Sequence, residues 1–162
     1  MMTPQAVAEA VRDAIWRDDR ATRALGIQVV AVGPGSATLT MTVREDMING
    51  HDICHGGLIA TLADSAFAYA CNAYNEVTVA SGFDIDLTAA ARCGDLLTAV
   101  ATEVARPGRT GVYDVAVRNQ RGETVAVLRG RSYTLKGKPV VEGLPMGSPN
   151  AVVDADPQAR RR

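Results

Sequence analysis

One apolar, helix-forming stretch constrains the fold of this chain more than any other feature. From Gly57 to Ala73 the sequence reads GLIATLADSAFAYACNA, and Asp64 is the only charged residue in it. A helix that is apolar nearly all round cannot lie on a protein surface, so the rest of the chain has to cover it. Burial also makes Asp64 costly, because a desolvated carboxylate is unfavourable unless something uses it.

Most of the remaining chain is typical of β-strands. A hairpin is predicted at Ile27–Val32 and Ala37–Val43, around the turn residues GPGS. After the apolar helix, four further strands are predicted at Val77–Thr88, Asp95–Ala105, Gly111–Asn119 and Thr124–Leu135. We predict an α+β fold, a six-stranded antiparallel sheet that curls around the central helix. The open edges of such a sheet favour pairing with a second copy.

Helix-cap residues and local composition predict the structure of the two ends of the chain. An extra N-terminal helix should begin at Thr3-Pro4, a helix cap followed by proline, and end at Gly26. With 162 residues, of which 47% are apolar, the chain suits one domain, which we place at residues 1–137. Glycine and proline accumulate beyond it, so we expect residues 138–162 to form a flexible tail.

Charge and cysteine content exclude several classes of function. The net charge is −1, which gives no general attraction to nucleic acid or to a membrane, and no apolar run has the length of a bilayer span. The three cysteines, Cys54, Cys71 and Cys93, form neither a C-x-x-C pair nor a disulfide framework, so we expect a reducing cytoplasm. His51 and His55 lack further ligands at a fitting spacing, and we predict no metal.

The candidate site combines the start of the apolar helix with its acid. Asp64 falls on a small, partly polar stripe that also carries Thr61, Ser65, Ala68 and Asn72 at helical spacing. His55, Gly56 and Gly57 precede the stripe, where the free N–H groups of a helix start can hold a carbonyl oxygen that becomes negative. Asp64 lies eight residues after Gly56, or about 12 Å along the axis, which is too far for one small reacting centre. We therefore expect Asp64 to face Gly56 of a second copy across a twofold axis.

Each of these residues also has an ordinary structural interpretation. Asp64 could be a hydrogen-bonded acid inside a dimer contact, and His55 could only cap or order the loop. Gly56 and Gly57 could form a tight turn, as could Asn49-Gly50. Cys54 and Cys71 are best explained as small core residues.

Two segments of the sequence together resemble a known family. The segment NGHDICHGGLIATLADSAFAYACN resembles the signature of hotdog-fold acyl-CoA thioesterases, and GRTGVYDVAVRNQRGETVAVLRGRS is similar to their PaaI type, which is linked to phenylacetate degradation. The resemblance covers about Leu25 to Leu135. It implies a hotdog fold, thioester hydrolysis and an assembly of two dimers.

The same resemblance implies roles for individual residues. Asp64 would be the general base or the nucleophile, Asn49 would position water or substrate, and His55 and Gly56 would orient and polarise the thioester carbonyl. Substrate contacts are expected from Gly57, Ser65, Ser81, Arg109 and Arg129. Coenzyme A is part of the substrate, and no cofactor or metal is implied. The cations that could hold its phosphates are Arg106, Arg109, Arg129, Arg131 and Lys136.

Three functions therefore compete. The leading hypothesis is hydrolysis of a small or aromatic acyl-CoA, such as phenylacetyl-CoA or its hydroxylated or ring-oxidised derivatives, to the free acid and CoA. A hotdog enoyl-CoA hydratase or dehydratase would also pair a histidine with an acid, but it would require a proline-rich loop where this chain has GGL. A non-catalytic acyl-CoA binding module would not need Asp64. The sequence leaves open whether water attacks directly or an anhydride with Asp64 forms first.

Overall fold

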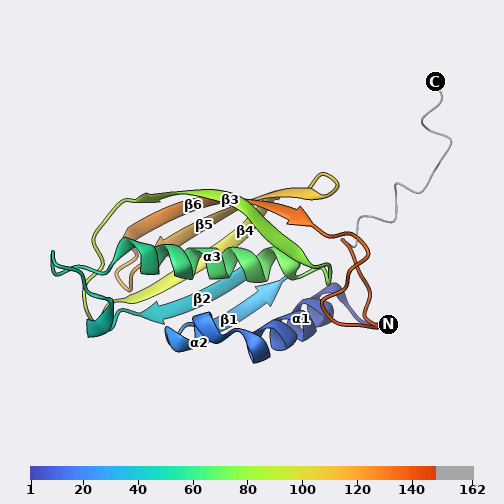
Figure 1. Ribbon diagram of the computed structural model, residues 1–162, viewed down its shortest axis with the longest axis horizontal. Helices are drawn as coiled ribbons and strands as arrows, with labels where there is room; N and C mark the ends of the chain where they lie inside the picture. Colours follow the sequence, from blue (N-terminus) through green and yellow to red (C-terminus); the bar gives the residue numbers. More distant parts are fainter. Residues whose placement is uncertain (149–162) are drawn as a thin grey trace, which may run out of the picture.

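A six-stranded antiparallel sheet wraps around one long central helix in the computed structural model, which describes residues 1–148 (Figure 1). The helices are α1 (Pro4–Asp18), α2 (Arg20–Ala24) and α3 (Gly56–Asn72), and a short 3-10 turn spans Glu45–Met47. The strands are β1 (Gln28–Gly33), β2 (Ser36–Thr42), β3 (Thr78–Leu87), β4 (Leu96–Ala105), β5 (Thr110–Arg118) and β6 (Thr124–Thr134). Their order across the sheet is β1-β2-β4-β5-β6-β3, so β1 and β3 are the edges. The predicted fold class is confirmed.

The central helix α3 forms the core with the inner face of the sheet. Its buried side includes Ile59, Leu62, Ala66, Phe67 and Ala70, and α3 contacts all six strands. The Phe67 ring packs at 5.4 Å from the ring of Tyr113 on β5 and lies directly over Gly130 on β6. The helix spans the predicted stretch, displaced by one residue at each end.

Alternating burial sets which face of each strand meets α3. On β6, Leu128, Gly130 and Ser132 are buried, whereas Val127, Arg129 and Arg131 are exposed on the opposite face. On β3, Phe83, Ile85 and Leu87 pair with Gly130, Leu128 and Ala126, so they face the helix side as their spacing predicts. Phe83 and Leu87 nevertheless remain 38% and 53% exposed, because β3 is an edge strand with no neighbour on its outer side.

The N-terminal region differs from the single helix that the sequence suggests. The chain breaks at Asp19 into α1 and α2, because the Asp19 carboxylate caps the second helix by accepting a hydrogen bond from the Thr22 N–H at 3.2 Å. The other carboxylate oxygen accepts the Tyr69 hydroxyl of α3 at 3.0 Å. The break therefore joins α2 to the central helix.

Part of the segment expected to be a flexible tail is held in place. Asn75 is fully buried, and its side-chain amide donates to the carbonyls of Val141 and Leu144 and accepts the Val141 N–H. Gly147 donates its N–H to the carbonyl of Tyr74. Residues 138–147 thus pack over the end of α3, while the terminal arginines lie outside the described residues. No helix within residues 1–148 combines the length and apolar character of a membrane span.

Candidate active site

The start of α3 presents one free backbone N–H. His55 occupies the cap position, and its Nδ1 accepts the Gly57 N–H at 3.1 Å. The N–H groups of Leu58 and Ile59 donate to the His55 carbonyl. Gly56 is left as the first helical residue whose N–H has no acceptor among residues 1–148. His55 therefore orders the loop and leaves Gly56 able to bind an oxygen from a ligand.

The loop before the helix fixes the orientation of Asn49. The side-chain oxygen of Asn49 accepts the N–H groups of His51 at 2.9 Å and Ile53 at 3.4 Å, and its backbone N–H donates to the Ile53 carbonyl. The loop therefore uses the acceptor of this amide, whereas the NH₂ group makes no hydrogen bond within the described chain. Asn49 can offer donors to a substrate, but its acceptor is occupied.

Asn49 and Gly56 line a common cavity of about 400 Å³. Its remaining walls are mainly apolar and are formed by Ile53, Cys54, Ile59, Leu87, Thr88, Ala89, Ala90 and Ala91. A Cβ atom built on Gly56 would lie 2.5 Å from Leu87 Cδ1, so this glycine permits the close approach of β3. The cavity therefore combines two polar donors with mainly apolar walls.

Asp64 lies two turns further along α3 and does not line this cavity. It is half-buried, and its carboxylate makes no hydrogen bond or ion pair with another residue in 1–148. Burial raises the pKa of Asp64 above its ordinary value of 3.8, because desolvation disfavours the charged form. A half-buried acid with a raised pKa is one that can exchange a proton near neutral pH more readily than an ordinary carboxyl group.

The two serines of the predicted site already have partners. Ser65 donates its hydroxyl to the Thr61 carbonyl at 2.7 Å and lies 3.3 Å from the Thr22 hydroxyl of α2. It therefore ties α2 to the central helix. Ser81 sits on β3 at the irregularity between Ala80 and Gly82, is exposed, and donates to the Arg131 carbonyl.

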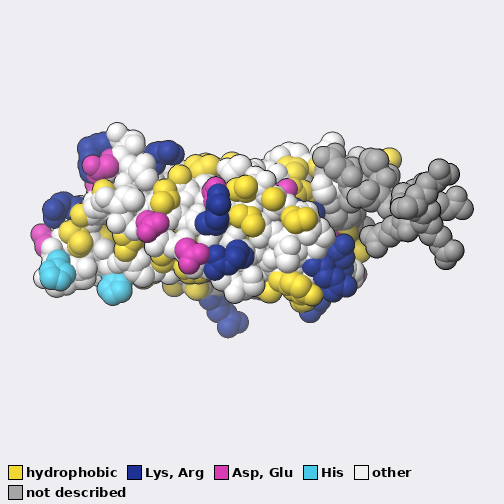
Figure 2. Space-filling model, turned by 90° about the horizontal axis from the view of Figure 1, so that it is seen from above, with side chains coloured by type: hydrophobic (Ala, Val, Ile, Leu, Met, Phe, Trp, Pro, Cys, Tyr) yellow, Lys and Arg dark blue, Asp and Glu magenta, His cyan; other side chains and the backbone are white. Residues whose placement is uncertain are grey.

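The predicted phosphate-binding cations are not gathered around the cavity. Arg129 lies on the face of the sheet opposite α3, where its Nε and Nη2 bond both carboxylate oxygens of Asp114 at 2.7 and 2.8 Å. Arg131 forms an ion pair with Asp84 at 2.6 Å on the same face. Figure 2 shows such basic and acidic side chains interspersed with apolar ones on the surface of the molecule.

The other cations lie near the β4–β5 turn or the end of β6. Arg106 packs over the Tyr74 ring at 4.2 Å and pairs with Glu76 at 2.9 Å, with both charged side chains largely buried. Arg109 is exposed and contacts the Tyr133 hydroxyl at 3.5 Å, and Lys136 is also exposed. Within residues 1–148 no three His, Cys, Asp or Glu side chains are grouped as metal ligands.

Sequence reasoning missed the wall of the cavity that follows β3. Thr88 to Ala91 come between two strands, and small residues in a connection carry no periodic signal. The available signal was the run TAAA directly after the exposed Leu87, since three alanines leave room that larger side chains would fill.

An antiparallel sheet that wraps around one central helix is the architecture of the hotdog fold. Residues 51–126 match the model of the Thioesterase superfamily. The acyl-coenzyme A thioesterase PaaI of Escherichia coli is 44% identical over 124 residues, which cover 76% of this chain and 89% of that protein. This chain therefore belongs to the thioesterase superfamily, in its PaaI type.

Solved structures agree with this assignment. The structure of E. coli PaaI, a protein of the phenylacetic acid degradation operon, aligns with a TM-score of 0.82 at 41% identity and covers 84% of this chain and 99% of its own. A mutant of the PaaI protein of Thermus thermophilus aligns with a TM-score of 0.70 at 36% identity, over 72% of this chain and all of that one. A Streptococcus mutans protein bound to acetyl CoA aligns at 0.65 and 25% identity, over 67% and 87% of the two chains.

Proposed function

We propose that this chain is an acyl-CoA thioesterase that hydrolyses a small or aromatic acyl-CoA, such as phenylacetyl-CoA, to the free acid and CoA. The observation that carries the proposal is that Gly56 and Asn49 line one cavity with donors that have no acceptor within residues 1–148, and that Asp64 has no partner in the same part of the chain. The family supports thioester hydrolysis, and the named relatives of E. coli and S. mutans support a CoA thioester and an acyl group in this size range.

The geometry supports a simple reaction. The thioester oxygen accepts the Gly56 N–H and the Asn49 amide, which stabilise its charge when the carbonyl carbon is attacked. Asp64 takes a proton from water, whose oxygen bonds to that carbon, and the C–S bond breaks to release the CoA thiolate, which then gains a proton. Alternatively, Asp64 attacks first and the resulting anhydride is hydrolysed.

The active unit we propose is a homodimer, because Asp64 is about 12 Å along the helix from the Gly56 of its own chain. The outer edge of β3 is open, and its exposed Phe83 and Leu87 lie on the same side of the sheet as α3. The opposite edge is protected, because β1 has a bulge and its Val32 carbonyl accepts the Gln5 side chain of α1. Pairing of two β3 edges would bring both copies of α3 together.

We further propose that two such dimers form a tetramer. The face of the sheet opposite α3 exposes Leu96, Val100 and Val127, which are 40–43% accessible in one chain. Apolar side chains gathered on a sheet face favour contact with another subunit. We also infer that the protein works in the cytoplasm, where its three free cysteines remain reduced.

The decisive experiment compares Asp64→Asn with wild type in an acyl-CoA panel read by a thiol-detecting reagent. We expect at least about a hundredfold loss of thiol release in an assembly that stays folded. The matched control is Asp13→Asn, at a 71% exposed side chain on α1, which should keep wild-type activity. Equal rates for Asp64→Asn and wild type would contradict the catalytic role. Hydration of an enoyl-CoA without thiol release would indicate the hydratase, and binding without reaction would indicate the binding module.

Subunit mixing tests whether the site is shared. Asp64→Asn and Asn49→Ala should each be inactive, but a dimer with one copy of each would contain one intact shared site. Random mixing should then restore about a quarter of the wild-type sites. No recovery, with exchange of subunits demonstrated, would show that each site uses Asp64 and Asn49 of the same chain.

A further inference from the structure

We infer that the cavity behind Gly56 is the acyl-binding pocket, and that the alanines at positions 89–91 determine how large an acyl group it accepts. This inference rests on the proposed function, since it places the acyl part of the thioester relative to Gly56. The cavity volume of about 400 Å³ lies within the usual range for small-molecule sites.

The chemistry of the walls fits an acyl group better than the rest of coenzyme A. Asn49 and Gly56 supply the polar donors of the cavity, and both suit a carbonyl oxygen. The Thr88 hydroxyl already donates to the Thr124 carbonyl at 2.8 Å. No cation belongs to the lining, so it offers nothing to a phosphate, and the amides of the pantetheine arm would lack partners against Ile53, Ile59 and Leu87.

The wall formed by the alanines is fixed at both of its ends. At its start, the N–H groups of Thr88 and Ala89 donate to the Val125 carbonyl of the β6 strand. At its end, the Ala91 carbonyl accepts the Cys54 N–H at 2.7 Å. The wall therefore connects the sheet to the loop that carries Asn49.

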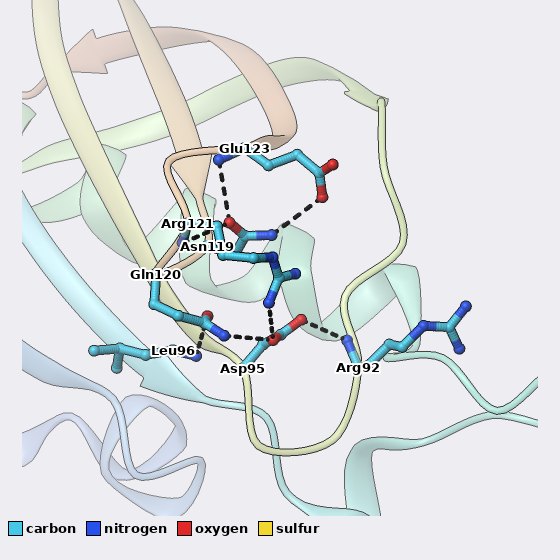
Figure 3. Close-up of polar contacts among 7 residues, drawn as sticks. All are labelled: Arg92, Asp95, Leu96, Asn119, Gln120, Arg121 and Glu123. Atoms are coloured by element: carbon cyan, nitrogen blue, oxygen red, sulfur yellow. Dashed lines mark hydrogen bonds and ion pairs between the residues drawn. The ribbon is translucent and has the colours of Figure 1, made fainter.

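A network around Asp95 anchors the residues that follow the wall (Figure 3). The carboxylate of Asp95, whose side chain is 8% exposed, accepts the Arg92 N–H at 2.9 Å and the Gln120 amide at 2.8 Å, and it pairs with Arg121 at 3.3 Å. The Arg92 side chain in turn donates to the Asp52 carbonyl at 3.4 Å. Because the backbone is held on both sides, the side chains at positions 89–91 set the free volume.

Enlarging these alanines tests the inference. Ala90→Leu is the first choice because position 90 lines the cavity and is exposed in the single chain, and Ala89→Leu, at a half-buried position, is the second variant. The matched control is Ala31→Leu, at an exposed alanine on the opposite edge strand β1. The substrates are acetyl-CoA and phenylacetyl-CoA, with thiol release as the measurement.

We expect Ala90→Leu or Ala89→Leu to lower kcat/KM for phenylacetyl-CoA at least about tenfold more than for acetyl-CoA, because added methylene groups exclude large acyl groups selectively. Ala31→Leu should leave the ratio unchanged. An equal loss of kcat/KM for both substrates, or weaker binding of free CoA, would assign the cavity to the pantetheine arm and overturn the inference. An unchanged ratio of the two kcat/KM values in both folded variants would also overturn it.

Binding to Asp64→Asn separates this inference from the proposed function. Calorimetry on this background measures acyl selectivity without turnover, so it remains informative if wild type releases no thiol. Loss of phenylacetyl-CoA affinity relative to acetyl-CoA on adding Ala90→Leu or Ala89→Leu supports the pocket. An unchanged preference contradicts the pocket even if hydrolysis is demonstrated.

Discussion

Replacing Gly56 by alanine should impair catalysis without unfolding the protein. The new Cβ would lie 2.5 Å from Leu87 Cδ1, whereas carbon atoms in contact are usually about 3.5–4.0 Å apart, so the atoms must separate by roughly 1 Å or more. The clashing Cδ1 is the end of a side chain that is 53% exposed in the single chain, so we expect the free energy of unfolding of the subunit to change by less than about 0.5 kcal/mol. A misplacement of about 1 Å within an active site can cost on the order of a hundredfold in rate.

The assay is kcat/KM for thiol release by Gly56→Ala, Leu87→Ala and the double variant. Alanine keeps the backbone N–H, so the loss in Gly56→Ala should be steric, and Leu87→Ala should recover much of it in a double-mutant cycle. Gly50→Ala is the control, because a Cβ there has no atom within 4 Å. Wild-type activity in Gly56→Ala, or a double variant no better than Gly56→Ala, would refute the steric explanation.

Three further changes probe packing and charge. Gly130→Ala should cost about 1–3 kcal/mol of stability, because its Cβ would lie 2.8–2.9 Å from three atoms of the buried Phe67 ring; an unchanged urea midpoint would contradict this. Because the pKa of Asp64 is raised in the folded state, the folded protein loses stability as the pH rises and this buried carboxyl becomes charged. Asp64→Asn should therefore be more stable than wild type at pH 7 and equal to it below about pH 3, where Asp64 is neutral in both the folded and the unfolded state. Thermal unfolding at both pH values checks this, and a higher stability of Asp64→Asn that persists in acid would argue against a cost from burying the charge. Hydrogen bonds, the Arg92 N–H first, hold the pKa of Asp95 below 3.8, so Asp95→Asn should be less stable at neutral pH, with a deficit that shrinks as pH falls through that lowered pKa. Urea unfolding at pH 7 and at about pH 3 measures the stability lost in Asp95→Asn, and an equal loss at both pH values would contradict this prediction.

Local periodicity predicted most of the fold. The apolar stretch at α3 and the alternating strands follow from which side chains must avoid water, and the residues that carry these patterns are adjacent in sequence. The helix break at Asp19 has a local part, the cap on Thr22, but the hydrogen bond from Tyr69 that joins the break to α3 spans fifty residues and has no local signal. The packing of residues 138–147 was missed for the same reason, since it depends on the buried side chain of Asn75.

For the candidate site, the sequence by itself predicted Asp64, His55 and Gly56, because an isolated acid and a glycine-led helix start are local features, and their roles stay predictions. Only the tertiary structure decided that the oxygen of Asn49 is used by its own loop, that Arg129 lies on the outer face with Asp114, and that positions 88–91 close a cavity beside Gly56. Hydrogen-bond partners and cavity walls depend on distances between segments remote in sequence, and no local pattern encodes those distances.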